Sequence, residues 1–201
     1  MDSSNTVNYM ENIKCILEPM PISNVSNVKD LSLGGLRMRQ LYIKQKVFSL
    51  SGKFTVKDQQ ENDIYYVEGS FMKVPKTFSI MNTARDEVAL ITKKVFSFLP
   101  KFLVDVNGQE VLTIKKEFSF LKARYTIDAA GIEVQGNWWD MDFQILHHGK
   151  IVGEVSKEWF TWGDSYKVQI IDEEIETVII ALVVAIDCVK ADQAAASAAS
   201  I

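Results

Sequence analysis

Basic residues recur at matching positions of an internal repeat, and their spacing suggests anion binding. The stretch KKVFSFLPKFLV at 93–104 matches KKEFSFLKARYTI at 115–127, which begins 22 residues later. KQKVFSLSGKFTV at 44–56 is a third copy, and SKEWFTWGDSYKV at 156–168 is a looser fourth. Gathered ammonium and guanidinium groups bind phosphate and other anionic groups. The candidate anion-binding residues are Lys93, Lys94, Lys115, Lys116, Lys122 and Arg124, together with Lys44 and Lys46 of the third copy.

The same lysines have a structural explanation that stays open. Lysines near strand ends discourage unwanted pairing between sheets. The two explanations differ in one respect: anion binding requires the lysines of neighbouring hairpins to converge on one surface.

Two other clusters carry side chains that could do chemistry. His147 and His148 are the only histidines. Adjacent residues of a strand point to opposite faces, so we expect a structural or surface role and no shared metal. Asp140 and Asp142 are predicted to share a face, and paired carboxylates can act as general acid and base. Nothing else in the sequence indicates a sugar site, which favours a solvated strand face.

No catalytic motif is present. The chain has no nucleophile elbow, phosphate-binding glycine loop, HExxH or CxxC. Cys188, inside an apolar run, is expected to be a small buried hydrophobe. We therefore expect a non-catalytic protein without a cofactor or metal. We expect the tryptophans to pack in the core and rim, with a binding platform as the alternative: Trp138, Trp139, Trp159 and Trp162.

The charge is unevenly distributed. The net charge is −4, but residues 38–124 carry 15 Lys/Arg and 9 Asp/Glu, whereas residues 125–201 carry 4 and 13. The acidic total and the absence of a reading motif argue against nucleic acid as a partner. The expected partners are anionic phospholipid or another protein. Two cysteines give no disulfide framework and no secretory signal is visible, so we expect a cytoplasmic protein, peripheral to the membrane where it binds lipid.

Alternation of apolar and polar residues begins near Met38 and predicts twelve strands. Residues 1–37 are rich in Ser and Asn and lack this periodicity, so we expect a poorly ordered extension or leader there. The domain is predicted over 38–190, followed by a low-complexity tail over 191–201. The predicted strands are 39–49, 52–57, 63–72, 77–82, 87–96, 101–106, 109–118, 122–127, 131–138, 141–147, 150–158 and 165–171.

The most apolar stretch, TVIIALVVAIDCV at 177–189, predicts a buried helix over about 173–190. Residues 175–189 would span about 22 Å as a helix, less than the roughly 30 Å of a bilayer core. Asp172 can cap its start. The helix is apolar all round between Glu176 and Asp187, as expected of a helix buried on every side. We expect Asp187 to lie near the mouth of the fold, hydrogen-bonded or hydrated.

With these elements in place, residues 38–190 resemble the LURP-one-related family, within the group that includes Tubby C-terminal domains and phospholipid scramblases. MRQLYIKQKVFSLSGKFTVKD at 38–58 is similar to the opening strands of the family, and GNWWDMDFQILHHGKIVGEVSKEW at 136–159 to its late strands. The ordered series Gly149-Lys150-Ile151, Ser156–Trp159, Asp164–Tyr166 and Ile186-Asp187 also resembles the scramblases.

The resemblance implies a closed twelve-stranded antiparallel barrel around a central C-terminal helix. It also implies binding of phosphoinositide-type headgroups by a basic patch, as in Tubby-like domains. A protein-interaction role and scramblase-like membrane association are the alternatives. The segment that resembles the proposed scramblase calcium loop offers Asp164, but Trp162 stands where an earlier acidic residue would be, so we expect no metal site.

Overall fold

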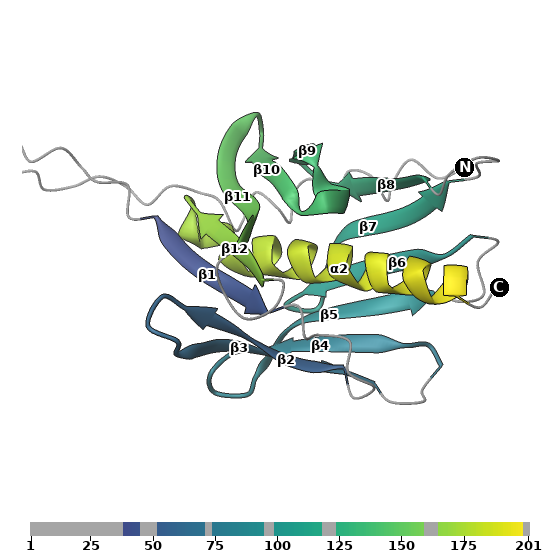
Figure 1. The fold of residues 1–201 in the computed structure, drawn as a ribbon, viewed down its shortest axis with the longest axis horizontal. Helices are drawn as coiled ribbons and strands as arrows, with labels where there is room; N and C mark the ends of the chain where they lie inside the picture. Colours follow the sequence, from purple (N-terminus) through teal and green to yellow (C-terminus); the bar gives the residue numbers. More distant parts are fainter. Residues whose placement is uncertain are drawn as a thin grey trace, which may run out of the picture. The chain divides into compact units, whose positions relative to one another are not determined.

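The computed structural model describes residues 38–44, 52–70, 74–94, 99–117, 124–158 and 165–198. Within them, twelve strands form one antiparallel sheet, confirming the prediction (Figure 1). The first six are β1 (Arg39–Lys44), β2 (Lys53–Asp58), β3 (Asp63–Gly69), β4 (Thr77–Met81), β5 (Glu87–Lys94) and β6 (Lys101–Val106). The others are β7 (Gln109–Glu117), β8 (Arg124–Ala129), β9 (Ile132–Asn137), β10 (Asp142–His147), β11 (Lys150–Glu158) and β12 (Ser165–Ile170).

The sheet is a nearly closed barrel. Its strand order is β8-β7-β6-β5-β4-β3-β2-β1-β12-β11-β10-β9, so β1 and β12, far apart in the chain, lie side by side. The two ends of this order, β8 and β9, follow each other in sequence but are not paired by backbone hydrogen bonds. We call the gap between them the seam. The closed barrel expected from the sequence is thus realised except at this one place.

A single long helix fills the barrel, as Figure 1 shows. A 3₁₀ turn, η3 (Glu173–Ile175), leads into α2 (Glu176–Ala198). Every residue of α2 from Ile179 to Val189 is buried. Alternate residues of the strands point at the helix, and many are fully buried, among them Leu41, Val56, Val67, Ile80, Ile91, Val104 and Ile114. The apolar run is therefore the core of the barrel.

Helix α2 extends eight residues beyond the expected end at 190. The alanine-rich residues 191–198, expected to be a tail, are helical because alanine has the highest helix propensity. The polar side chains of Asp192 and Gln193 also bond to strands. No helix in the described part of the chain is both long enough and apolar enough to span a bilayer.

The two ends of the barrel differ. We call the end where α2 begins the proximal end and the end where it finishes the distal end. Odd-numbered strands run from proximal to distal, because β12 ends where α2 begins and every neighbouring pair is antiparallel. The distal end therefore receives Lys94, Lys101, Glu117 and Tyr125, which lie at or near the ends of their strands.

A buried carboxylate fixes the proximal end of α2. Glu176 Oε2 lies 2.8 Å from Arg39 Nη1, and the Tyr65 hydroxyl donates to Glu176 Oε1 at 2.7 Å. Burial, and then the bond to this carboxylate, raise the pKa of Tyr65 to about 12. Asp172, as expected, caps the preceding turn by accepting from the Glu174 N–H at 3.0 Å. Both oxygens of Glu176 are thus paired, as a buried carboxylate requires.

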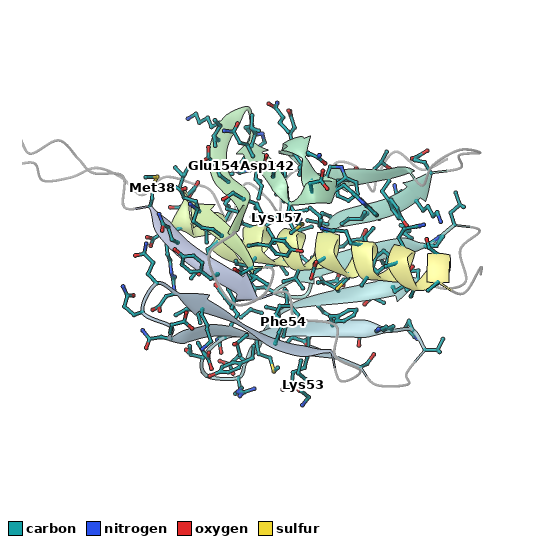
Figure 2. The ribbon with its side chains drawn as sticks, viewed as in Figure 1. Met38, Lys53, Phe54, Asp142, Glu154 and Lys157 are labelled. Atoms are coloured by element: carbon teal, nitrogen blue, oxygen red, sulfur yellow. The ribbon has the colours of Figure 1, made fainter. Side chains whose placement is uncertain are left out.

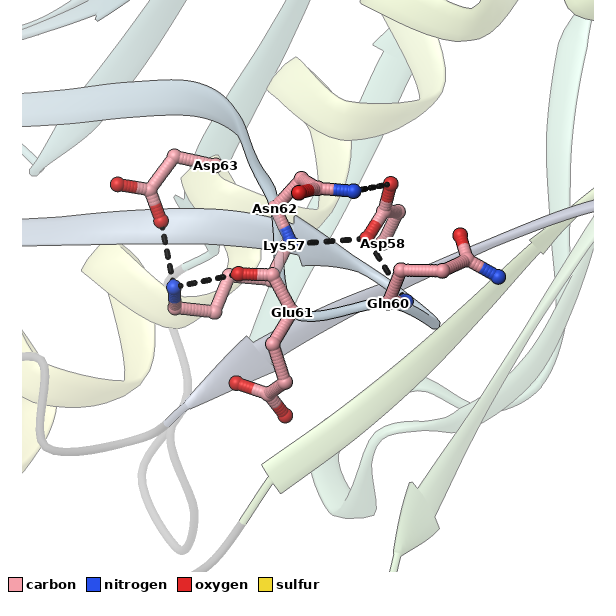
Figure 3. A network of polar contacts seen from close by, with 6 residues as sticks. All are labelled: Lys57, Asp58, Gln60, Glu61, Asn62 and Asp63. Atoms are coloured by element: carbon pink, nitrogen blue, oxygen red, sulfur yellow. Dashed lines mark hydrogen bonds and ion pairs between the residues drawn. The ribbon is translucent and has the colours of Figure 1, made fainter.

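The β2–β3 turn holds a cluster of acidic residues whose role is structural (Figure 3). Asp58 accepts from the backbone N–H groups of Gln60 and Asn62 at 2.8 and 2.9 Å. Lys57 Nζ donates to Asp63 at 2.6 Å and to the Glu61 carbonyl at 3.0 Å. Glu61 has φ 64°, a left-handed conformation that these contacts stabilise. The cluster closes a tight turn at the proximal end.

Several expectations fall outside the described residues. These are the extension at 1–37, Lys46, Trp159, Trp162 and Asp164, and the helix-flanking residues 199–201.

Met38, at the start of β1 in Figure 2, is exposed and its sulfur accepts from Gln169 Nε2 at 3.0 Å.

We predict that Val183→Asp prevents folding, because Val183 is wholly buried within the apolar part of α2 and an unpaired carboxylate there would lose its hydration. Circular dichroism and size-exclusion chromatography measure the outcome. Ala194→Asp, on the exposed part of the same helix, is the matched control and is expected to fold. A folded, monodisperse Val183→Asp protein would show that α2 is not the core.

Candidate functional site

Three lysines lie side by side on the outer surface of the distal end. Lys94 of β5 pairs in register with Lys101 of β6, and Lys101 pairs with Lys115 of β7. Residues directly opposite in an antiparallel sheet share a face, with Cα atoms about 4.5–5.5 Å apart. The flanking inward residues Phe102 and Ile114 are buried, so the three lysines point outward. We call this row the lysine ladder.

The lysine ladder has little compensating charge. Lys115 Nζ lies 2.9 Å from Asp128 Oδ2 on β8, an exposed ion pair that screening makes weak. No ion pair joins Lys94 or Lys101 to a carboxylate among the described residues. Like charges directly opposite each other in a sheet are destabilising. This repulsion is relieved when an anion lies over the row.

The other predicted lysines of these strands point inward and bind α2. Lys93 forms an ion pair with Asp192. Lys116 Nζ donates to Gln193 Oε1 at 3.3 Å, and the Tyr125 hydroxyl donates to the same oxygen at 3.1 Å. Cations also interact favourably with the carboxyl end of a helix. Lys93 and Lys116 therefore anchor the distal part of the core helix.

The structure therefore divides the predicted anion-binding residues into outward and inward groups. The structure brings Lys94 and Lys115 onto one outer row and turns Lys93 and Lys116 toward the helix. Arg124 starts β8 opposite Glu117, with nothing described of its side chain, and Lys122 lies outside the described residues, as does the Lys44 side chain.

Sequence reasoning missed Lys101, the central member of the ladder. It follows Pro100 and has no equivalent lysine in the second copy of the repeat, where Ala123 stands. The register of the predicted hairpin between 87–96 and 101–106 was the signal that would have found it.

The two histidines contradict the expected geometry. His148 is a turn residue with φ 50°, so strand alternation does not apply to it, and its ring centroid lies 4.3 Å from that of His147. The His148 ring packs over Gly131, where an added Cβ would lie 2.6 Å from the ring. Burial, and then the neighbouring His148, lower the pKa of His147. No three His, Cys, Asp or Glu residues in the described ranges gather to hold a metal ion.

Asp140 and Asp142, which the sequence predicted to share a strand face, do not form such a pair. Asp140 belongs to a 3₁₀ turn, η2 (Trp138–Asp140), where Asn137 Nδ2 donates to it at 2.6 Å. Asp142 begins β10 and is exposed (Figure 2). Met141 between them adopts a left-handed conformation, so period-two alternation does not place the two side chains on one strand face.

Among the described residues, Asp187 is the carboxylate with a buried oxygen that lacks a hydrogen-bond partner. It is 3% exposed, its Oδ1 receives a long 3.4 Å contact from the Tyr166 hydroxyl, and its buried Oδ2 has no partner. Burial raises the pKa of Asp187 to about 6, and nearby Lys190 and Tyr166 only partly oppose this. Cys188 beside it is a free, buried thiol, as expected, and burial raises its pKa well above the ordinary value.

The model of the LURP-one-related family matches residues 39–187. The chain belongs to this family. The uncharacterized protein YxjI of Bacillus subtilis (strain 168) is 30% identical over 152 residues, covering 76% of the chain and 94% of that protein. A crystal structure of an Arabidopsis thaliana protein has a similar fold to this chain, with a TM-score of 0.54 at 16% identity over 76% of this chain and 91% of the other.

We predict that Asp187→Asn stabilises this LURP-one-related barrel at pH 7–8 by about 1–3 kcal/mol, because the buried charge is removed. The folded pKa of about 6 exceeds the ordinary value of 3.8. Proton uptake by Asp187 thus stabilises the fold fully below about pH 4, and this stabilisation is lost as the pH rises through 6. The variant should lack this loss.

Urea unfolding between pH 4.5 and 8 measures the difference between the variant and the parent, in which the contributions of other groups cancel. Asp192→Asn, five residues along α2, is the control, because it removes an ion pair with Lys93 and should weaken the fold slightly without a step near pH 6. A difference between Asp187→Asn and the parent that is independent of pH contradicts the assignment.

Proposed function

We propose that the barrel is a non-catalytic module that binds the phosphorylated headgroups of anionic membrane lipids through the lysine ladder. The observation that carries the proposal is the direct registry of Lys94, Lys101 and Lys115 across three adjacent strands. Three ammonium groups so arranged match the several oxygens of a phosphate group. A rigid sheet supports them, so little ordering is needed on binding.

The division of the repeated lysines supports this proposal. Lys93 and Lys116 make polar contacts with α2, whereas the outward lysines do not contact the helix, and the ion pair found for them among the described residues is the exposed one of Lys115 with Asp128. Edge protection is also a poor explanation for the ladder, because β5, β6 and β7 are interior strands with a neighbour on both sides. Insertion of α2 into a bilayer is not proposed, since the strands already enclose its apolar surface.

Protein interaction is the second candidate, and the seam favours it. β8 and β9 end the strand order without pairing to each other, which leaves backbone groups on both edges. An extended segment of a partner adds to such an edge through main-chain hydrogen bonds. Half-buried Ile127 and Val134 flank the seam and offer apolar contacts to an added strand.

We predict that replacing Lys94, Lys101 and Lys115 together by glutamine lowers affinity for anionic vesicles by roughly 100-fold. Each lysine near an anionic surface contributes about 1 kcal/mol, and 1.4 kcal/mol is tenfold in affinity. Sedimentation with vesicles of equal parts phosphatidylserine and phosphatidylcholine measures binding. The parent should also lose affinity at about 1 M salt, where the Debye length falls to about 3 Å.

The matched control replaces three lysines of the acidic half, Lys150, Lys157 and Lys167, by glutamine. This removes the same net charge from β11 and β12, which lie on the opposite wall of the barrel because β12 stands six places from β6 in the strand order. The control should therefore change affinity far less. Equal losses in the two triple variants would indicate a general charge effect. Failure of the parent protein to bind anionic vesicles would refute the proposed function.

We predict for the second candidate that the seam-facing amides of β8 and β9 exchange hydrogen rapidly in the free protein, unlike those of interior β6. Hydrogen exchange read by mass spectrometry tests this. Uniformly slow exchange across β8 and β9 would show that no edge is available to a partner strand.

A further inference from the structure

An aromatic corner lies next to the lysine ladder at the distal end. It comprises Tyr125 of β8 with Trp138 and Trp139 of η2. The Tyr125 and Trp139 rings stack with centroids 5.9 Å apart, and Trp138 meets Trp139 edge-on at 5.4 Å and Tyr125 at 6.3 Å. The corner spans the seam, because Tyr125 lies on β8, next to the ladder strand β7, whereas the two tryptophans follow β9.

The backbone beneath the corner is firmly held. Asn137 Nδ2 donates to Asp140 Oδ2 at 2.6 Å, and Asn137 Oδ1 accepts from the Asp140 backbone N–H at 3.2 Å. The Met141 N–H donates to the Trp138 carbonyl at 3.2 Å, and the Met141 side chain is fully buried. Trp138 packs against the core. Trp139 is nevertheless 37% exposed, so internal packing does not account for its whole ring.

The aromatic corner and the lysine ladder are connected by a short chain of contacts. Tyr125 pairs in register with Lys116, and both side chains donate to Gln193 of α2. Lys115 of the ladder is the next residue along β7 and points to the outer face, whereas Lys116 and Tyr125 point inward. The exposed tryptophan and the cationic row therefore lie at the same end of the barrel but on opposite sides of its wall.

An exposed tryptophan and a row of lysines at the same end of the barrel suit a membrane that meets that end. Tryptophan prefers the headgroup region of a bilayer, where its ring is partly in apolar surroundings and its N–H remains hydrated. Lysines around the same end meet anionic headgroups. A small soluble anion would satisfy the ladder but would leave Trp139 in water, so the pairing favours a lipid surface over a free phosphate.

We propose that Trp139 inserts into the interfacial region of an anionic bilayer while the lysine ladder lies on its headgroups. This inference rests on the proposed function and adds an orientation to it: the distal end of the barrel, where α2 finishes, faces the membrane. The proximal end, with the Glu176 contacts, faces away.

Binding of the full chain to vesicles of equal parts phosphatidylserine and phosphatidylcholine tests the inference. Trp139→Ala should lower vesicle affinity roughly tenfold, in line with the apolar area that insertion would cover, and should leave binding of inorganic pyrophosphate unchanged. The ladder triple variant should weaken both. Ile151→Ala is the matched control, since Ile151 is 43% exposed at the proximal end, and its vesicle affinity should equal that of the parent.

A second measurement does not depend on the stability of the alanine variant. Lipids brominated near the headgroup should quench tryptophan fluorescence in the parent more than in Trp139→Phe. Ladder-dependent vesicle binding without any effect of Trp139 in either measurement would overturn the insertion while leaving the proposed function intact. Absence of all vesicle binding by the parent would overturn both, and pyrophosphate binding alone would identify a soluble anion as the ligand.

Discussion

The burial of one wholly apolar helix is the constraint on which this structure depends. From Ile179 to Val189 every residue of α2 is buried, so a sheet that covered only one side would leave much of its surface exposed. A twelve-stranded sheet that curls until β1 meets β12 covers all sides. Each strand then needs only one apolar face, which explains the alternation along the chain. The enclosing sheet leaves its outer face available for charge, and the lysine ladder occupies part of it.

Polar contacts at both ends set the position of the helix along the barrel axis. An apolar helix inside an apolar barrel meets little resistance to sliding along the barrel axis, because hydrophobic burial is non-directional. Glu176 with Arg39 and Tyr65 fixes one end, and Asp192 with Lys93 fixes the other. These contacts also explain why neighbouring lysines of one repeat have different roles. Side chains on the same strand face as Ile91 of β5 or Ile114 of β7 point to the helix, whereas side chains on the other face point to solvent.

Strand positions, the antiparallel barrel and the buried helix were predictable because alternation and length report directly on burial. The repeat placed Lys94 and Lys115 in one candidate set, but it aligns Lys94 with Lys116 and Lys93 with Lys115, so it did not separate the outward lysines from the inward ones. The seam was not predictable, since a short connection around Gly131 ordinarily joins paired strands. The ring contact of His147 and His148 depends on one positive φ angle, which the sequence does not reveal. Asp187 was expected to be hydrogen-bonded or hydrated, and its unpartnered oxygen follows only from the three-dimensional packing around it. Ala194–Ala198 read as a tail, although their intrinsic propensity is helical.

The place of α2 in the chain has a consequence for biosynthesis. Translation proceeds from the amino terminus, so all twelve strands leave the ribosome before the helix that fills them. Neighbouring hairpins can form as they emerge, but their apolar faces have nothing to pack against, and β1 must wait for β12, 131 positions later at the Arg39–Ile170 pair. Until α2 has been synthesised, the nascent domain is therefore a set of hairpins whose apolar faces are exposed to water. Folding of this domain is completed only once α2 has been synthesised, and a ribosome that stops before the α2 codons releases a sheet with no core.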